Sequence, residues 1–306
     1  MRLVKEKPLG AIGGAIVLVL LFAGIFADVL APHDYSEVNI YDRLAPPSAE
    51  HWLGADQVGR DVLSRIIHGA RVSVIIGLAA STLNVTVATI VGTACGFLGG
   101  RFDLLVQRFV DAWMCFPGLL LLITVMSIVG QGITQIILVL GIQWGIGGSR
   151  ITRSAVIAIK DNVYMTAATA VGCSNGRMLL RHILPNIMAP IIIMFSTSIG
   201  GVILTEASLS FLGFGLPPDV PSWGGMLSWE GRRYMELAPM LAFWPGFCLS
   251  VVVYGMNMLG DAMRDLLDPR LRGGVGGMGA RGAELARKAM DKMEARARKT
   301  DRKSIN

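Results

Sequence analysis

The side chains that usually carry catalysis are not grouped in this 306-residue sequence in a way typical of an enzyme. The sequence contains no Gly-x-x-x-x-Gly-Lys-[Ser/Thr] phosphate-binding loop, no Gly-x-Ser-x-Gly nucleophile motif and no His-Glu-x-x-His zinc motif. We therefore expect no catalytic residue, no ATP site and no bound cofactor. We expect no nucleic-acid partner either.

Three residues before position 72, His51, Asp56 and Asp61, have side chains of the kinds that bind metal ions. Ordinary loop polarity accounts for the same residues, because this part of the chain is rich in the Pro, Asp and Asn that mark turns. The four histidines of the chain also lack the spacing of a helical metal motif. We predict loop polarity and no metal site.

Polar side chains inside long apolar segments are the next candidates, because burying them in a membrane costs free energy. Each of them either lines a solute pathway or forms hydrogen bonds between neighbouring helices, and the sequence leaves both interpretations open. For Glu206, a position at the aqueous boundary of the membrane is a third interpretation. The candidates are Asn84, Thr86, Gln143, Glu206 and Asn257.

The stretch YMTAATAVGCSNGRMLLRHILPN, residues 164–186, is polar although apolar segments lie on both sides of it. If it forms a helix, four small or short residues share a nearly flat patch that another protein can approach closely. These residues are Ala167, Ala168, Val171 and Gly172. A docking helix and a plain structured loop both fit this pattern.

Further along the same stretch, Arg177 and Arg181 are four residues apart, so a helix places them on one face. There they are suited to pairing with acidic groups of a partner. Pro185 restricts the residue before it and ends the helix where the next apolar segment begins.

The composition of the chain indicates which kind of secondary structure holds these residues in place. Hydrophobic residues make up 53% of the chain and charged residues only 16%, whereas a soluble domain is about one-quarter charged. The apolar residues fall in blocks long enough to cross a bilayer, which takes about 20 residues. We predict an all-α membrane protein with six spans, at about residues 9–31, 72–98, 110–129, 133–148, 187–212 and 240–259.

Two Gly-x-x-x-Gly pairs, Gly92 with Gly96 and Gly141 with Gly145, lie in the second and fourth predicted spans. Small residues at this spacing allow two membrane helices to approach closely. We predict a packing role for both pairs. Two tryptophans between the last two spans, Trp223 and Trp229, are expected at the membrane interface.

The distribution of Lys and Arg predicts the orientation. With the N-terminus in the cytoplasm, 22 of the 28 basic residues lie on the cytoplasmic side and six outside. Both termini and residues 164–186 are then cytoplasmic. We divide the chain into residues 1–71, with the first span and a long outer loop, a core over 72–272 that contains the cytoplasmic loop 150–186, and a basic tail helix over 273–306.

The stretch TAATAVGCSNGRMLLRHILPN resembles the EAA loop of the membrane-spanning subunits of bacterial ABC importers, which reads Glu-Ala-Ala-x-x-x-Gly with a downstream Ile-Leu-Pro. Thr166 stands where that family usually has glutamate. The matching residues are Ala167, Ala168, Gly172, Leu184 and Pro185.

The resemblance covers nearly the whole chain. HWLGADQVGRDVLSRIIHGARVSVIIGL, TEASLSFLGFGLPPDVPSWGGMLS and NMLGDAMRDLLDPRLR look like segments of the dipeptide/oligopeptide/nickel group, and specifically of its second permease subunit. The resemblance implies a type I importer fold, a second homologous permease, two ATPase subunits that use ATP and Mg²⁺, and an extracytoplasmic solute-binding protein. It also implies that the EAA helix couples the permease to an ATPase.

Two other classes of membrane protein remain as alternatives. A secondary transporter usually shows inverted repeats and buried ionisable residues, and a scaffold would recruit a cytoplasmic partner without moving a solute. Within the resembling group, peptides are the expected cargo. Nickel chelates and other small solutes are alternatives that no residue excludes.

Overall fold

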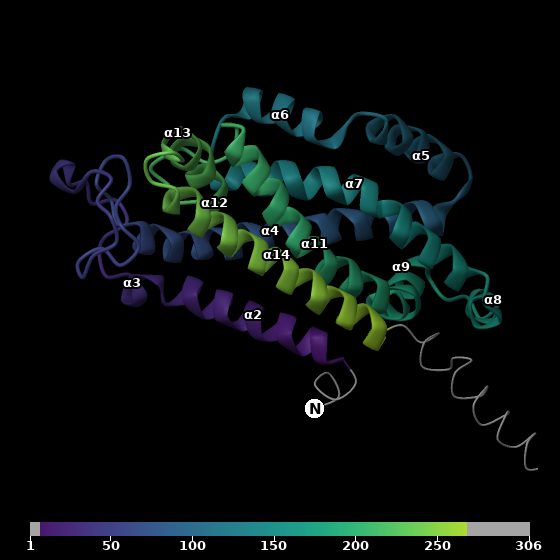
Figure 1. The fold of residues 1–306 in the computed structure, drawn as a ribbon. Coiled ribbons are helices and arrows are strands. Elements are labelled where there is room, and N and C mark those ends of the chain that lie inside the picture. Colours follow the sequence, from purple (N-terminus) through teal and green to yellow (C-terminus); the bar gives the residue numbers. More distant parts are fainter. Residues whose placement is uncertain (1–6, 268–306) are drawn as a thin grey trace, which may run out of the picture. The chain divides into compact units, whose positions relative to one another are not determined.

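The computed structural model describes residues 7–267 of the chain, and regular structure there is almost wholly helical (Figure 1). A single β-bridge joins Ala55 to Asp61. The long helices are α2 (Pro8–Ile25), α4 (Val62–Leu98), α5 (Gly100–Met114), α6 (Gly118–Val129), α7 (Ile133–Lys160), α11 (Met188–Phe211) and α14 (Met240–Leu267). The short elements are α3 (Ala27–Leu30), η1 (Ile40–Asp42), α8 (Val163–Ala170), α9 (Asn175–Arg177), η2 (Met178–Ile183), α10 (Leu184–Asn186), α12 (Trp223–Gly225), η3 (Met226–Gly231) and α13 (Arg232–Tyr234).

Helix α4 is the element against which α7, α11 and α2 pack. Its 37 residues make a rod of about 55 Å at 1.5 Å per residue, much longer than the roughly 30 Å of a hydrocarbon core. The helix begins ten residues before position 72, so residues 62–71 are continuous with the second predicted span. Asp61 begins the helix, because its carboxylate accepts a hydrogen bond from the Ser64 amide.

The backbones of α4 and α7 approach each other closely at glycines. A Cβ added to Gly96 would lie 2.8 Å from the Cβ of Val156, and one added to Gly145 would lie 2.6 Å from the Cβ of Val87. The same holds for Gly92 and Gly141, which face α7 and α4 respectively. The packing role predicted for both Gly-x-x-x-Gly pairs is confirmed, and each pair packs against the helix that carries the other.

One apolar core lies where α4, α6, α7 and α11 meet. It is formed by fully or almost fully buried aliphatic side chains from all four helices, including Val72, Ile76, Leu122, Met126, Ile136, Leu140, Val202 and Leu209. Burial of such side chains contributes about 1.5–3 kcal/mol each relative to exposure in water. This core fixes one end of α7 on α4.

An ion pair joins the end of α2 to α4. The Arg71 guanidinium donates hydrogen bonds to the carbonyl oxygens of Gly24 and Ile25 and to both carboxylate oxygens of Asp28, the latter at 2.8 Å. The bidentate contact with Arg71 lowers the pKa of the Asp28 carboxyl below its ordinary value. The chain therefore turns back onto α4 directly after its first helix.

The third predicted span, residues 110–129, is not one helix. Helices α5 and α6 are bent by 90° at the break between Met114 and Gly118. The reason is Pro117, which has no amide N–H and disfavours helical geometry at Phe116. The prediction of a continuous span here is therefore wrong.

The fourth predicted span is the first part of a longer helix, since α7 continues past Gly148 to Lys160. Gln135, Gln143 and Arg150 interrupt its apolar sequence. Among residues 7–267, four helices are long and apolar enough to cross a membrane, namely α2, α4, α11 and α14, and the bent pair counts as a fifth only if its two helices form one broken span. The fifth and sixth predicted spans correspond to α11 and α14.

Trp223 is buried inside the protein, where it is 2% exposed and its Nε1 donates a hydrogen bond to the Ile66 carbonyl at 3.1 Å. It joins the segment after α11 to α4.

The predicted tail helix over 273–306 lies outside the described residues. Residues from Arg264 onward belong to a separate unit, described only as far as Leu267.

We expect Gly92→Ala to destabilise the protein by about 1–3 kcal/mol, because the new methyl group overlaps the Ser149 carbonyl and Thr152 of α7. Gly147→Ala is the matched control, since nothing lies within 4 Å of a Cβ there. Thermal unfolding of the purified protein in detergent measures both. Equal midpoints for the two variants would contradict the close approach of α4 and α7.

Candidate coupling site

Residues 163–187 form a short helix, a turn and a second helical stretch rather than one continuous helix. Helix α8 ends at Ala170, and Gly172 has a left-handed backbone with φ of +81°. The Gly172 amide donates to the Thr169 carbonyl at 2.9 Å and the Cys173 amide to the Ala168 carbonyl at 3.0 Å. This pair of bonds is a Schellman cap, which favours glycine at the left-handed position.

One side of this helix–turn–helix is anchored to the rest of the chain. Met165 of α8 and Met178 and Ile183 of η2 are buried in a cluster with Val156 of α7 and Ile187. Phe97 of α4 packs against the same cluster. The segment is therefore attached to the C-terminal ends of both α4 and α7. The polar loop over residues 31–61, called the 31–61 segment below, lies at the other end of α4, where Asp61 is the N-cap.

The other side exposes apolar residues. Val163 is 86% exposed, Val171 88% and Leu180 70%. Thr166 and Ala167 are also exposed, on α8 between the first two. Val163 lies on α8, Val171 directly follows that helix and Leu180 lies on η2, and exposed apolar groups within one segment are typical of an interaction surface. We call these five residues the docking surface.

The remaining candidates of this segment divide between its two sides. Arg177 and Arg181 are exposed, and within residues 7–267 neither makes an ion pair. Gly172 and Pro185 are exposed, and Ala168 is half-buried. Leu184 packs against the buried cluster, which places it with the anchoring side.

Four of the five polar candidates from the apolar segments lie in separate contacts. Asn84 is 3% exposed, between α4 and α7. The Gln143 amide donates to the Gly118 carbonyl at 2.9 Å, which supports the start of α6. Glu206 is 2% exposed and accepts a hydrogen bond from the Ser210 hydroxyl at 2.7 Å. Asn257 is exposed on α14, next to Gly200.

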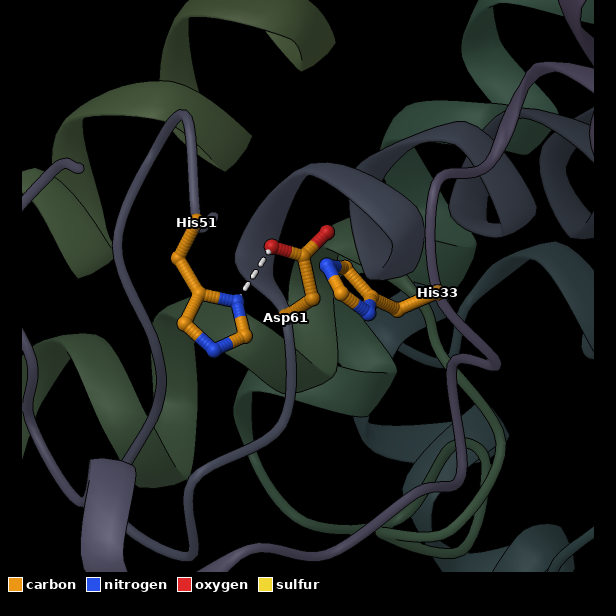
Figure 2. Close-up of side chains that lie close together, drawn as sticks. All are labelled: His33, His51 and Asp61. Atoms are coloured by element: carbon orange, nitrogen blue, oxygen red, sulfur yellow. Dashed lines mark hydrogen bonds and ion pairs between the residues drawn. The ribbon is translucent and has the colours of Figure 1, made fainter. Parts of the chain in front are cut away.

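The polar loop before α4 contains a cluster that sequence spacing did not indicate. His33, His51 and Asp61 lie together, as Figure 2 shows. Asp56, which we grouped with His51 and Asp61, instead receives a hydrogen bond from Arg60 Nε at 2.6 Å. Burial opposes the charge on His51, but the hydrogen bond to Asp61 and the attraction of the Asp61 and Asp42 carboxylates outweigh it and raise its pKa.

Comparison with known families identifies the class of protein. The family described as "Binding-protein-dependent transport system inner membrane component" matches residues 88–273. The chain belongs to this family. A second family, described as "N-terminal TM domain of oligopeptide transport permease C", matches residues 1–47. The chain is therefore a multi-pass membrane permease subunit of a transport system, and the resemblance drawn from the sequence motifs is confirmed.

Three relatives show how far the similarity extends. The dipeptide transport system permease protein of Alkalihalophilus pseudofirmus is 38% identical over 268 residues, 88% of each chain. The oligopeptide transport system permease protein of Bacillus subtilis is 36% identical, also over 88% of each chain. The glutathione transport system permease protein of Pectobacterium atrosepticum is 38% identical over 85% of this chain and 86% of its own.

We expect Gly172→Ala to loosen the turn after α8, although nothing lies within 4 Å of the added Cβ. The left-handed backbone costs an alanine roughly 1–2 kcal/mol. Gly172→Asn should be milder, because asparagine tolerates this conformation. Hydrogen–deuterium exchange at the amides of residues 172 and 173 measures the turn. Exchange as slow in Gly172→Ala as in the wild type would contradict the cap.

Proposed function

We propose that the docking surface is the contact of this permease with an ATPase subunit of an ABC importer. The supporting observation is its two-sided construction, with Met165 and Met178 buried and Val163, Val171 and Leu180 exposed to the surroundings. A segment that only connected two spans would gain nothing from exposed valines and leucine. An apolar surface held rigidly on a buried cluster suits a protein partner.

Anchoring on α4 and α7 gives the contact a mechanical consequence. A displacement of α8 acts on Val156 of α7 and Phe97 of α4 through the buried cluster. Because the glycine contacts hold α4 and α7 together along their length, the two helices move as one body. Closing of the ATPase subunits would then tilt this pair and change which side of the membrane the pathway faces.

The complete importer in this proposal contains a second homologous permease, two ATPase subunits and an extracytoplasmic solute-binding protein. ATP and Mg²⁺ are used by the ATPase subunits. The excess of Lys and Arg on one side supports a cytoplasmic location for both termini and the docking surface. The 31–61 segment then lies outside, where the solute-binding protein delivers its cargo.

We propose peptides as the cargo. The relatives described above are named for dipeptide, oligopeptide and glutathione transport, and glutathione is itself a tripeptide. Similarity along nearly the whole chain supports a shared class of solute. These names favour peptides over nickel chelates, and family membership argues against a secondary transporter or a scaffold.

We expect Val171→Glu to uncouple the importer. An unpaired carboxylate placed in an apolar contact should weaken binding of the ATPase by at least about tenfold, or roughly 1.4 kcal/mol. ATPase activity stimulated by the solute-binding protein, measured in proteoliposomes, should fall accordingly. Val171 is preferred to Gly172 because its replacement does not strain the left-handed turn.

Val171→Ala is the matched control, since it shortens the same side chain without adding charge and should retain most of the stimulation. Thermal unfolding of the isolated permease should be the same for both variants, because residue 171 is exposed. If Val171→Glu hydrolysed ATP and transported at wild-type rates, residues 163–187 would not be the coupling site.

A cargo assay separates peptides from metal chelates. Proteoliposomes with the complete importer and its binding protein should take up a labelled dipeptide or oligopeptide in an ATP-dependent manner, and excess unlabelled peptide should compete. Uptake of a nickel chelate without competition by peptides would contradict the proposed cargo while leaving the coupling proposal intact.

A further inference from the structure

Three separate parts of the 31–61 segment bring metal-binding types of side chain to the N-terminus of α4. His33 follows α3, His51 follows η1, and Asp61 is the N-cap of α4. In Figure 2 the two imidazole rings lie on either side of the carboxylate. One donor atom from each residue lies within 4.8 Å of the others. Donor atoms around tetrahedral zinc are about 3.3 Å apart, given bonds of about 2.0–2.2 Å, so modest side-chain rotations bring them into range.

The carboxylate and one ring are already oriented by other contacts. The Oδ2 atom of Asp61 accepts hydrogen bonds from the amide and the hydroxyl of Ser64, both at 2.8 Å. Its Oδ1 atom lies 3.0 Å from Nδ1 of His51. The His33 amide donates to the same Ser64 hydroxyl at 3.1 Å. Contacts of this kind fix metal ligands in place and typically raise affinity for the ion.

The second nitrogen of the His51 ring is buried and makes no hydrogen bond. His51 is 7% exposed, and its Nε2 atom has no hydrogen-bond partner within residues 7–267. The Asp42 carboxylate oxygen lies 3.7 Å from it, beyond hydrogen-bonding distance. When Nδ1 binds an ion, Nε2 carries the ring proton and faces the Asp42 carboxylate, which is the usual orienting contact of a metal-bound histidine.

The surroundings of the His33, His51 and Asp61 cluster favour a cation. A cavity of about 60 Å³ lies beside the cluster, enough for an ion or a water molecule. Five carboxylates contribute to its lining, and no lysine or arginine does. The acidic residues are Asp34, Glu37, Asp42, Glu50 and Asp61.

We propose that His33, His51 and Asp61 bind one divalent transition-metal ion of the zinc class, with His51 binding through its Nδ1 atom, which faces Asp61. Imidazole nitrogens favour such ions, whereas Mg²⁺ and Ca²⁺ prefer oxygen ligands alone. The ion connects positions 33 and 51 to the N-cap residue of α4 and so holds the 31–61 segment against the long helix. This proposal is independent of the cargo and of the coupling mechanism.

The test uses the full-length chain, purified in detergent with an affinity tag that contains no histidine. Zn²⁺ is titrated in competition with a chromophoric chelator, in the presence of millimolar Mg²⁺. We expect one Zn²⁺ per wild-type chain and at least about tenfold weaker binding in His33→Ala. Asp61→Asn should weaken binding similarly, while asparagine keeps the helix cap.

His182→Ala is the matched control, because this histidine lies near the docking surface and should not alter Zn²⁺ binding. His33 is only half-buried, so His33→Ala decides the question even if Asp61→Asn does not fold. Absence of Zn²⁺ binding by the wild type, equal affinity in His33→Ala, or displacement of Zn²⁺ by Mg²⁺ would each overturn the proposal.

Discussion

The close contact between α4 and α7 is the constraint on which the rest of the structure depends. Glycine on one helix faces a larger side chain or a carbonyl on the other, as Gly96 faces Val156 and Gly145 faces Val87. In a membrane, where helices gain little from the hydrophobic effect between them, this close packing is the main attraction. The result is a rigid pair that extends beyond the bilayer and carries a different structure at each end.

At one end, the pair supports the buried cluster under α8. At the other, α4 alone reaches into the polar loops, where Asp61 caps it and Trp223 bonds to Ile66. The Asp56 carboxylate lies there beside Arg60, which donates to it. One continuous helix thus connects the 31–61 segment with the buried cluster under the docking surface, as the proposed mechanism requires.

Sequence reasoning predicted those features that depend on composition and short spacing. The bounds expected for residues 187–212 agree with α11, because a long apolar block determines a span. The two glycine pairs correctly predict a contact between helices. Two local signals were available but underused, namely Pro117 at the break before α6 and Gly172 at the end of α8.

Other features depend on contacts between residues distant in sequence. Helix α7 continues through a charged stretch partly because Arg153 pairs with Asp103 of α5 at 2.6 Å, and no hydropathy pattern shows that partner. His33 joins His51 and Asp61 only after the 31–61 segment has folded back onto α4. The role of Asn84 was equally undetermined, because a polar residue in a span has the same sequence signal whether it lines a pathway or lies between helices.

In the proposed importer, the docking surface on α8 and the following turn touches an ATPase subunit. Site-specific photo-crosslinking in the assembled complex tests this directly, with the photoreactive amino acid placed at position 167 or 171 and, as a control, at the exposed position 41 of the 31–61 segment. We predict an ATP-state-dependent crosslink to the ATPase from positions 167 and 171 and none from position 41. Crosslinks from 167 and 171 to lipid or solvent only, in a complex shown to contain the ATPase, would contradict the account.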